Sequence, residues 1–349
     1  MDFILGPLYT LFGWLTRIFY GFFGNYGLAI IALTVLIRGL LIPLNIKSQK
    51  SMLKMQALSG KQAELQRKYG DDKKKYQEEL VKMQQENGAM GLSGCLLPLL
   101  QLLFIWPIFR IVSGPLFYLS QVSKENIESM ITLGQEMGFV GNNVIVNNHI
   151  GLLSALNNSG DFLNQCVSKG YMAFDQLLDL HFLGIDLTNT PSVNPAMWIK
   201  EPGVYIPLLF IPILVVLIQV FSMQFAKFLK PGYKQEQEAK QRAKNNPARQ
   251  GQVQENTSAE TTMKIMNWTM PLIMLVTTFT MPAAMGLYWI VGGIMGVLTQ
   301  LIVYFMFTKP YELKKAEIEA KKEAVFKKKA QADEEDKKGN NKKSGKKKK

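Results

Sequence analysis

The chain has 349 residues, a formal net charge of +13 and a mean hydropathy of +0.04. Its apolar residues fall in a few long blocks and its charges in others. This distribution excludes a set of ordinary soluble domains and indicates an integral membrane protein with charged segments in water. Only two cysteines are present, Cys95 and Cys166, so the composition favours neither a disulfide framework nor a cysteine metal site.

The first 24 residues are rich in aromatic side chains but are short and interrupted by glycine. We expect residues 1–24 to form an amphipathic helix that lies in the interface on the outer side of the membrane, where aromatic rings are favoured. The alternative is a sixth span with a cytoplasmic N-terminus, which would leave the other helices unchanged. The start has no basic stretch before its apolar part and no early lipobox cysteine, so we expect neither a cleaved signal nor a lipid anchor.

Arg38 lies inside the first apolar block, residues 25–46, which is long enough to cross a bilayer. An ionised guanidinium in the hydrocarbon costs at least roughly 2.5–3.5 kcal/mol on insertion scales, so it marks a candidate functional site. The alternative is that Arg38 extends to the nearby membrane surface, because Lys47 follows only about 13 Å further along the helix.

Residues 47–91 combine charges with apolar residues at helical spacing, on either side of a turn at Gly70-Asp71-Asp72. The pattern predicts a cytoplasmic hairpin of two antiparallel amphipathic helices. A methionine-rich face would make adaptable contacts with varied apolar segments, through the candidate contact residues Met52, Met55, Leu58, Leu65 and Met83. The alternatives are a basic surface that rests on anionic headgroups, or a solvated linker with a self-packed seam.

Four further spans are predicted at residues 92–113, 204–226, 264–281 and 284–308. The last two come from 44 uncharged residues between Lys264 and Lys309. As one helix these residues would be about 66 Å long, twice the hydrocarbon thickness of roughly 30 Å. We therefore expect a break at Met281-Pro282-Ala-Ala-Met-Gly286.

Positive charge sets the orientation. The segments 47–90, 226–264 and 309–349 hold ten, eight and sixteen Lys or Arg, whereas residues 114–203 hold three. We expect the basic segments, including the loop 227–263, to be cytoplasmic, with the N-terminus outside and the C-terminus inside. Residues 114–203 would form an extracytoplasmic, partly helical cap to which the sequence assigns no function.

Several stretches resemble the YidC/Oxa family of membrane protein insertases, in a bacterial form similar to that of Gram-positive members. They are the arginine span followed by Pro43-Leu-Asn-Ile-Lys47, the entry to the second span at Glu86-Asn-Gly88-Ala-Met-Gly91, the segment Phe182-Leu-Gly184-Ile-Asp186, and the final pair with Met270-Pro271-Leu and Gly286-Leu-Tyr-Trp289. The long segment 114–203 departs from the short connection that is common in Gram-positive members.

The resemblance implies an all-α integral membrane protein: five transmembrane helices around a polar groove open to the cytoplasm, with a cytoplasmic amphipathic helical hairpin. It places Arg38 in the groove. The other groove candidates are Gln219, Trp289, Gln101, Gln300 and Tyr288. For these five residues, interhelical hydrogen bonding or ordinary packing is the alternative.

The resemblance also implies a nucleotide-independent insertase and chaperone rather than an enzyme. It would move short polar segments of nascent membrane proteins through the groove and release their helices into lipid, alone or with the Sec translocon. No cofactor is expected: the sequence has no Gly-x-x-x-x-Gly-Lys-Ser/Thr loop, and its histidines, His149 and His181, both fall in the outer segment. A small-molecule transporter and a membrane-bound enzyme are the competing classes, and no inverted repeat or catalytic motif favours them.

The tail 309–349 is basic and of low complexity, and it ends in Lys346, Lys347, Lys348 and Lys349. It is predicted either to dock on ribosomal RNA, bringing nascent chains to the groove, or only to fix the topology and touch anionic lipids.

Overall fold

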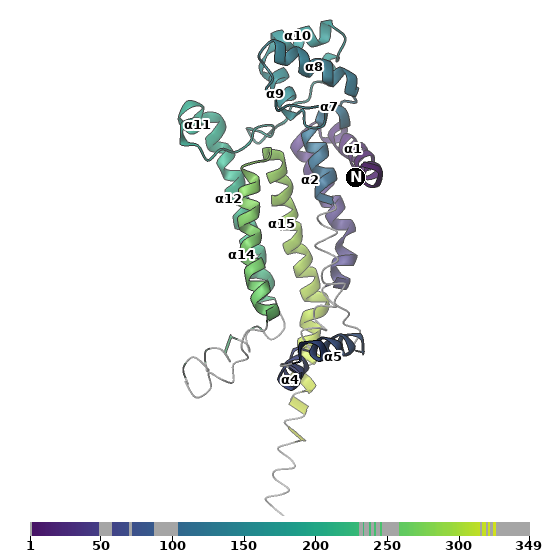
Figure 1. Cartoon of the computed structure of the whole chain (residues 1–349), viewed down its shortest axis with the longest axis vertical. Coiled ribbons are helices and arrows are strands. Elements are labelled where there is room, and N and C mark those ends of the chain that lie inside the picture. The colour runs from purple at the N-terminus through teal and green to yellow at the C-terminus, as the bar shows by residue number, and fades with distance from the viewer. Residues whose placement is uncertain are drawn as a thin grey trace, which may run out of the picture.

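The computed structural model describes residues 2–48, 58–69, 72–86, 104–229 and 258–314, with short fragments between 233 and 245 and between 316 and 325. The described part is mostly helical. Long helices lie along the long axis of the molecule, a cluster of short helices covers one end, and the pair α4 and α5 lies toward the other (Figure 1).

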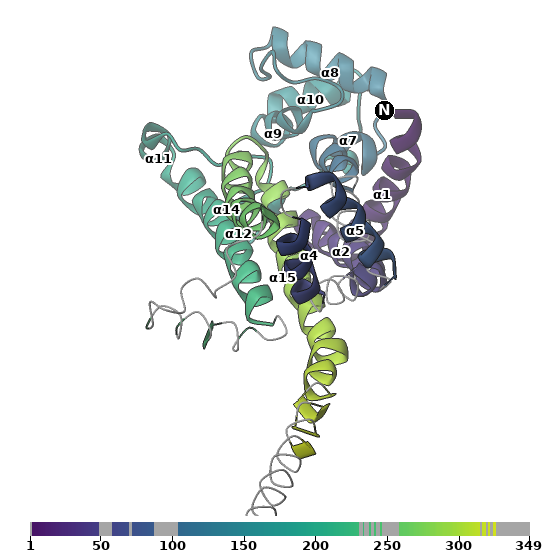
Figure 2. The same cartoon turned by 60° about the horizontal axis from the view of Figure 1, so that its bottom comes forward.

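The N-terminal helix α1, Asp2–Phe23, lies across the long axis near the end that carries the short helices (Figures 1 and 2). It ends at Gly24, whose φ of +61° is the left-handed conformation that glycine adopts without strain. One face of α1 exposes large apolar side chains at helical spacing: Leu11, Trp14, Ile18 and Phe22. Such a face suits a helix lying in a membrane interface, and the interfacial position of residues 1–24 stays a prediction.

Helix α2, Tyr26–Leu40, carries Arg38 in its last turn. Asn25 caps α2 by accepting a hydrogen bond from the Leu28 amide at 3.1 Å. A second helix, Ile42–Ser48, continues α2 after a bend of 45°.

The three long helices at the C-terminal side are α12, α14 and α15. They extend over Pro202–Phe228, Ser258–Thr278 and Ala283–Val303. Residues 279–282 separate α14 from α15. This break includes Met281 and Pro282, the first two residues of the predicted break at Met281–Gly286. A π-helical turn at Tyr304–Thr308 continues α15 toward the tail.

By length and composition, two described helices can cross a membrane: α12, and the continuous helix Ala283–Ile318 that contains α15. The bent pair of α2 and Ile42–Ser48 is a third candidate if it counts as one span. The helix Phe104–Ser113 is apolar but shorter, and residues 92–103 of the predicted second span lie outside the described part. The count of five spans stays a prediction.

Glycines of α15 allow its neighbours to approach closely. A Cβ at Gly286 would overlap Ile211 of α12, and a Cβ at Gly293 would overlap Ile218 of the same helix. Small residues permit this close packing of membrane helices. Helix α15 therefore lies between α12 on one side and α2 on the other (Figure 1).

Residues 114–203 form the cap, whose buried side chains belong to a hydrophobic core that continues into the helix bundle. Its helices are α7 Pro115–Tyr118, α8 Lys124–Glu136, α9 Ile150–Asn158, α10 Gly160–Ser168 and α11 Pro195–Lys200, with a 3₁₀ turn at Phe174–Gln176. Fully buried core side chains come from α7, α8, α9 and α10; they include Leu116, Ile127, Met130, Leu153 and Phe162. Burial of such side chains is worth roughly 1.5–3 kcal/mol each, so this core stabilises the cap.

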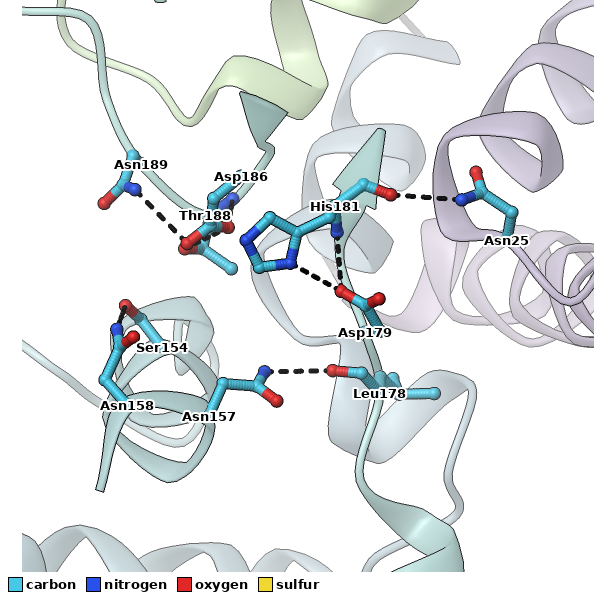
Figure 3. Close-up of polar contacts among 10 residues, drawn as sticks. All are labelled: Asn25, Ser154, Asn157, Asn158, Leu178, Asp179, His181, Asp186, Thr188 and Asn189. Carbon is cyan, nitrogen blue, oxygen red and sulfur yellow. Dashed lines mark hydrogen bonds and ion pairs between the residues drawn. The ribbon is translucent and has the colours of Figure 1, made fainter. Parts of the chain in front are cut away.

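A small β-hairpin fastens the cap to α2. Strands β1, His181–Phe182, and β2, Ile185–Asp186, pair antiparallel. Asn25 donates through Nδ2 to the carbonyl of His181 at 3.0 Å (Figure 3). The Phe182 ring occupies the space that a Cβ at Gly27 would need.

The end of the same hairpin caps α15. The carbonyls of Leu187 and Asn189 accept hydrogen bonds from the amides of Ala284 and Ala283, at 3.2 and 2.9 Å. Asp186 holds this turn by accepting from the Thr188 amide and hydroxyl and from the Asn189 amide group (Figure 3). One short segment therefore ties α2, α15 and the cap together at one end of the bundle.

The predicted hairpin 47–91 is described in part, as α4, Ser59–Tyr69, and α5, Lys73–Glu86. Asp72 caps α5 by accepting from the Lys75 amide at 3.1 Å. Gln62 donates to the Tyr76 hydroxyl at 3.4 Å and joins the two helices. Of the predicted contact residues, Leu58, Leu65 and Met83 are partly buried, and Met52 and Met55 lie outside the described residues.

Candidate functional site

Arg38 is half-buried, and its side chain lies against α15. The guanidinium carbon is 6.0 Å from the ring centroid of Tyr288, a distance at which a cation is attracted to an aromatic face. A Cβ at Gly292 would lie 2.8 Å from Nη2 and 3.4 Å from the guanidinium carbon. The guanidinium therefore packs on the bare backbone of α15, and only a glycine at position 292 leaves room for it.

The charge of Arg38 is not neutralised by an acidic side chain within the described residues. Its main neighbours there are the face of Tyr288, which is 2% exposed, and a glycine backbone. Ionisable side chains in membrane segments usually pair with one another or face a water-filled space. A cation left without a counter-ion can attract an incoming anionic group.

A second polar contact joins α12 to α15 further along the bundle. Gln300 donates through Nε2 to the Ser222 hydroxyl at 3.2 Å, while its Oε1 is buried and finds no partner in the described structure. Gln219 is half-buried one turn before Ser222, and no described contact joins it to Arg38. Gln300 follows Gly292 by eight residues, or about 12 Å of helix, so this contact lies about two turns from Arg38.

Trp289 follows Tyr288 on α15, and successive residues of a helix point about 100° apart, so its side chain leaves the helix in another direction. Its indole nitrogen is buried and, within the described residues, makes no hydrogen bond. A buried indole N–H normally has a partner, so this donor is available to a bound group. The structure thus places Tyr288 against Arg38 and Gln300 against Ser222, but it does not join Gln219 or Trp289 to either pair. Gln101 lies outside the described residues.

Two residues of this region were not predicted from the sequence, Gly292 and Ser222. A signal for the first exists, since Gly292 and Gly296 form a Gly-x-x-x-Gly pattern in an apolar helix, which is typical of close helix packing. No local pattern marks Ser222, because its role depends on Gln300, 78 residues away.

Among the residues that the structure describes, no group of three His, Cys, Asp or Glu side chains could hold a metal ion. Cys166 is a free thiol buried in the cap, and this burial raises its pKa to about 11, against a smaller opposing effect of Lys169. A thiol with a raised pKa is a poor nucleophile and metal ligand at neutral pH, so Cys166 serves the core.

The sequence model of the family described as 60Kd inner membrane protein matches residues 18–310. Similar proteins named membrane protein insertase YidC occur in several bacteria. That of Wolinella succinogenes is 37% identical over 112 residues, which are 32% of this chain and 20% of that protein. That of Caldanaerobacter subterraneus subsp. tengcongensis is 40% identical over 100 residues, 29% of this chain and 48% of that protein. That of Aeromonas hydrophila is 38% identical over 107 residues, 31% and 18% of the two chains.

The chain thus matches between about a fifth and a half of the length of these relatives. The similarities establish a family without separating a Gram-positive subtype within it. The family match includes Arg38, Tyr288, Gln300 and the hairpin at His181–Asp186. Because it covers most of the sequence, the chain belongs to the 60Kd inner membrane protein family, also called YidC/Oxa.

Proposed function

We propose that this protein is a nucleotide-independent membrane protein insertase and chaperone. It moves short polar segments of nascent membrane proteins across the bilayer and releases their transmembrane helices sideways into lipid. The observation that carries the proposal is the position of Arg38: a cation on an apolar helix, held on Tyr288 and Gly292 without an acidic partner in the described chain. Family membership supports the same reading.

The physical obstacle to insertion is the transfer of polar groups through roughly 30 Å of hydrocarbon. A polar groove that reaches part of the way shortens this path and lowers the desolvation cost. A permanent cation in the groove attracts acidic residues of the entering segment, more strongly where the local dielectric constant is low. Burial of the substrate's own apolar helix then drives its release into lipid.

The proposed groove is enclosed by five helices, is open to the cytoplasm and is closed on the outside. The hairpin at His181–Asp186 supports closure on the outside, because it joins the outer ends of α2 and α15. The Ser222–Gln300 contact and the half-buried Gln219 support a polar lining on the cytoplasmic side. In the proposed topology, the protein crosses a bacterial plasma membrane with its N-terminus outside and its C-terminus inside.

The first experiment is protease-protected insertion of a small single-span protein with an acidic N-terminal segment into liposomes that contain only this chain. Arg38→Ala is expected to lower insertion about tenfold, which corresponds to about 1.4 kcal/mol of lost attraction. Arg38→Lys is expected to keep most activity, because it keeps the charge.

A substrate with an uncharged leading segment is the matched control, and it should lose little in Arg38→Ala. Equal activity of wild type and Arg38→Ala on both substrates would contradict the role of the charge. Insertion that occurs only after addition of the Sec translocon would make the protein a Sec-dependent chaperone instead of an autonomous insertase.

The partners are proposed to include the ribosome, through the basic tail that ends in Lys346–Lys349, and anionic lipids. These lysines lie outside the described residues, and their charge supports the proposal. Binding to ribosomal RNA would weaken steeply with salt, because each neutralised phosphate releases counter-ions. Removal of residues 333–349 should abolish co-sedimentation with ribosomes at low salt, and unchanged co-sedimentation would remove this role.

A further inference from the structure

A cavity of about 270 Å³ lies at the cap end of the bundle, away from Arg38. Helix α1 forms one wall with Tyr9 and Thr10, and the end of the helix Phe104–Ser113 forms another with Arg110. Lys124, at the start of α8, and His149, just before α9, complete the lining. The volume is close to the lower end of small-molecule sites, roughly 300 Å³.

The cavity is positively charged. Arg110 and Lys124 both line it, and among the side chains that the structure describes, none of those in its lining is acidic. Glu125 follows Lys124 along the chain but is fully exposed to solvent and is not part of the lining. An anion inside the cavity would therefore meet two cations and, among the described lining residues, no competing carboxylate.

Both cations are held in place by other groups. Arg110 donates through Nη1 to the Asn147 carbonyl at 3.2 Å, and its guanidinium carbon is 6.0 Å from the centroid of the Tyr9 ring. The ammonium of Lys124 is 5.2 Å from the centroid of the Phe117 ring. Within the described residues the Arg110 guanidinium makes one hydrogen bond, so the planar group retains donors of the kind that match phosphate oxygens.

His149 gives the cavity a rigid, neutral wall. Its Nε2 accepts from the Leu116 amide at 3.2 Å, and its Nδ1 lies 2.8 Å from the Val146 carbonyl, to which it donates. The hydroxyl of Thr10 is likewise bonded to the carbonyl of Gly6. These bonds fix the wall before a ligand arrives, which reduces the ordering cost of binding.

The position of the cavity indicates its ligand. It is bounded by α1, a helix that also exposes large apolar side chains, among them Trp14 at 50% and Phe22 at 81% exposure, as expected at a lipid interface. The anionic group present at high concentration at that level is the phosphodiester of a phospholipid. We propose that the cavity binds the phosphate group of a phospholipid in the leaflet on the cap side, with Arg110 and Lys124 as its charged contacts. This proposal uses the interfacial position of α1 and does not depend on insertase activity.

The test uses the full chain in nanodiscs of equal parts phosphatidylcholine and phosphatidylglycerol, followed by native mass spectrometry of retained lipid. Wild type is expected to retain one phosphatidylglycerol under activation that removes annular lipid. The double variant Arg110→Gln/Lys124→Gln should retain at least tenfold less. Arg110→Lys keeps the charge and should retain most of the lipid.

Lys169→Gln is the matched control, since it removes an exposed cation of the cap that does not line the cavity. Thermal unfolding of each variant in the same nanodiscs shows whether the cap is still folded. Lys124→Gln alone changes an exposed side chain and should leave the fold intact. This variant is expected to lose part of the bound lipid, so it tests the proposal even if the Arg110 variants unfold. Equal retention by wild type, Lys124→Gln and the double variant would overturn the site.

Titration with inorganic phosphate in detergent distinguishes a lipid headgroup from a free anion. Weak, millimolar binding of phosphate that competes with short-chain phosphatidylglycerol is expected for a headgroup site. Tight binding of phosphate, with no lipid retained by wild type, would overturn the assignment to a phospholipid.

Discussion

The guanidinium of Arg38 on α2 lies directly on the backbone of Gly292 on α15, with Nη2 only 2.8 Å from the place where a Cβ of residue 292 would stand. These two residues are 254 positions apart, and each explains the other. Because the glycine has no side chain, the surface of α15 has a gap at this position, and the guanidinium of Arg38 occupies it. The position of the cation within the bundle is therefore set by α15 as much as by α2.

Gly292→Ala should displace the guanidinium without disturbing the helices, because the side chain that must move is the flexible end of Arg38. We expect insertion of a substrate with an acidic leading segment to fall several-fold, and Gly292→Val to lower it further. The measurement is the liposome insertion assay. Gly296→Ala is the control, since its Cβ would make an ordinary contact of 3.9 Å with the Ser222 hydroxyl. If Gly292→Val inserted acidic substrates as well as wild type, the position of the guanidinium would not matter.

Ser222→Ala removes the hydroxyl that accepts from Gln300. Interhelical hydrogen bonds in membranes contribute about 0.6 kcal/mol on average, so a small loss of stability is expected. The double variant Ser222→Ala/Gln300→Leu also removes the buried amide. It should recover much of the lost stability, because neither partner of the hydrogen bond is then left unpaired. A double-mutant cycle of unfolding in detergent measures the coupling, and additive effects of the two changes would show that the contact contributes nothing.

Gly27→Ala should loosen the hairpin from α2, because a Cβ at this position would overlap the Phe182 ring. Overpacking of this kind typically costs about 1–3 kcal/mol. We expect faster proteolysis at the exposed turn Leu183–Gly184. Gly21→Ala is the matched control, since a Cβ there has open space. Phe182→Ala in the Gly27→Ala background should relieve the overlap, and no change in cleavage in any of these variants would contradict the contact.

The stability of the cap should fall as the pH is lowered from 6.5 to about 4. Burial lowers the pKa of His149 to about 4, against a smaller opposing effect of its hydrogen bond to the Val146 carbonyl. The unfolded chain, with a histidine pKa of about 6.5, binds a proton in this range and the folded chain does not. The contribution of neutral His149 to the free energy of unfolding is therefore complete above about pH 6.5, and about 3 kcal/mol of it is lost by pH 4.

Hydrogen exchange of cap amides at pH 7 and pH 4.5, corrected for the intrinsic exchange rate, measures this dependence. His149→Gln keeps a polar side chain but cannot titrate, so in this variant the stability of the cap should change less with pH. An equal slope in wild type and His149→Gln would assign the pH dependence to other groups.

The sequence by itself determined what depends on local pattern. Long apolar runs predicted the helices now seen as α12 and α15, and Pro282 predicted the break between α14 and α15. Arg38 was identified because a charge in an apolar helix is costly wherever that helix packs. The motifs of the arginine span and the final pair indicated the YidC/Oxa family, which the family match establishes.

Tertiary structure decided which residues meet. Gly292 lies under Arg38, Ser222 accepts from Gln300, and Phe182 covers Gly27, and each pair joins segments that are far apart in the chain. The cavity at Arg110 and Lys124 likewise requires α1, α8 and the loop before α9 to come together. Periodicity and hydropathy are properties of one segment, whereas these contacts depend on the relative positions of two or more packed segments, which no single stretch of sequence encodes.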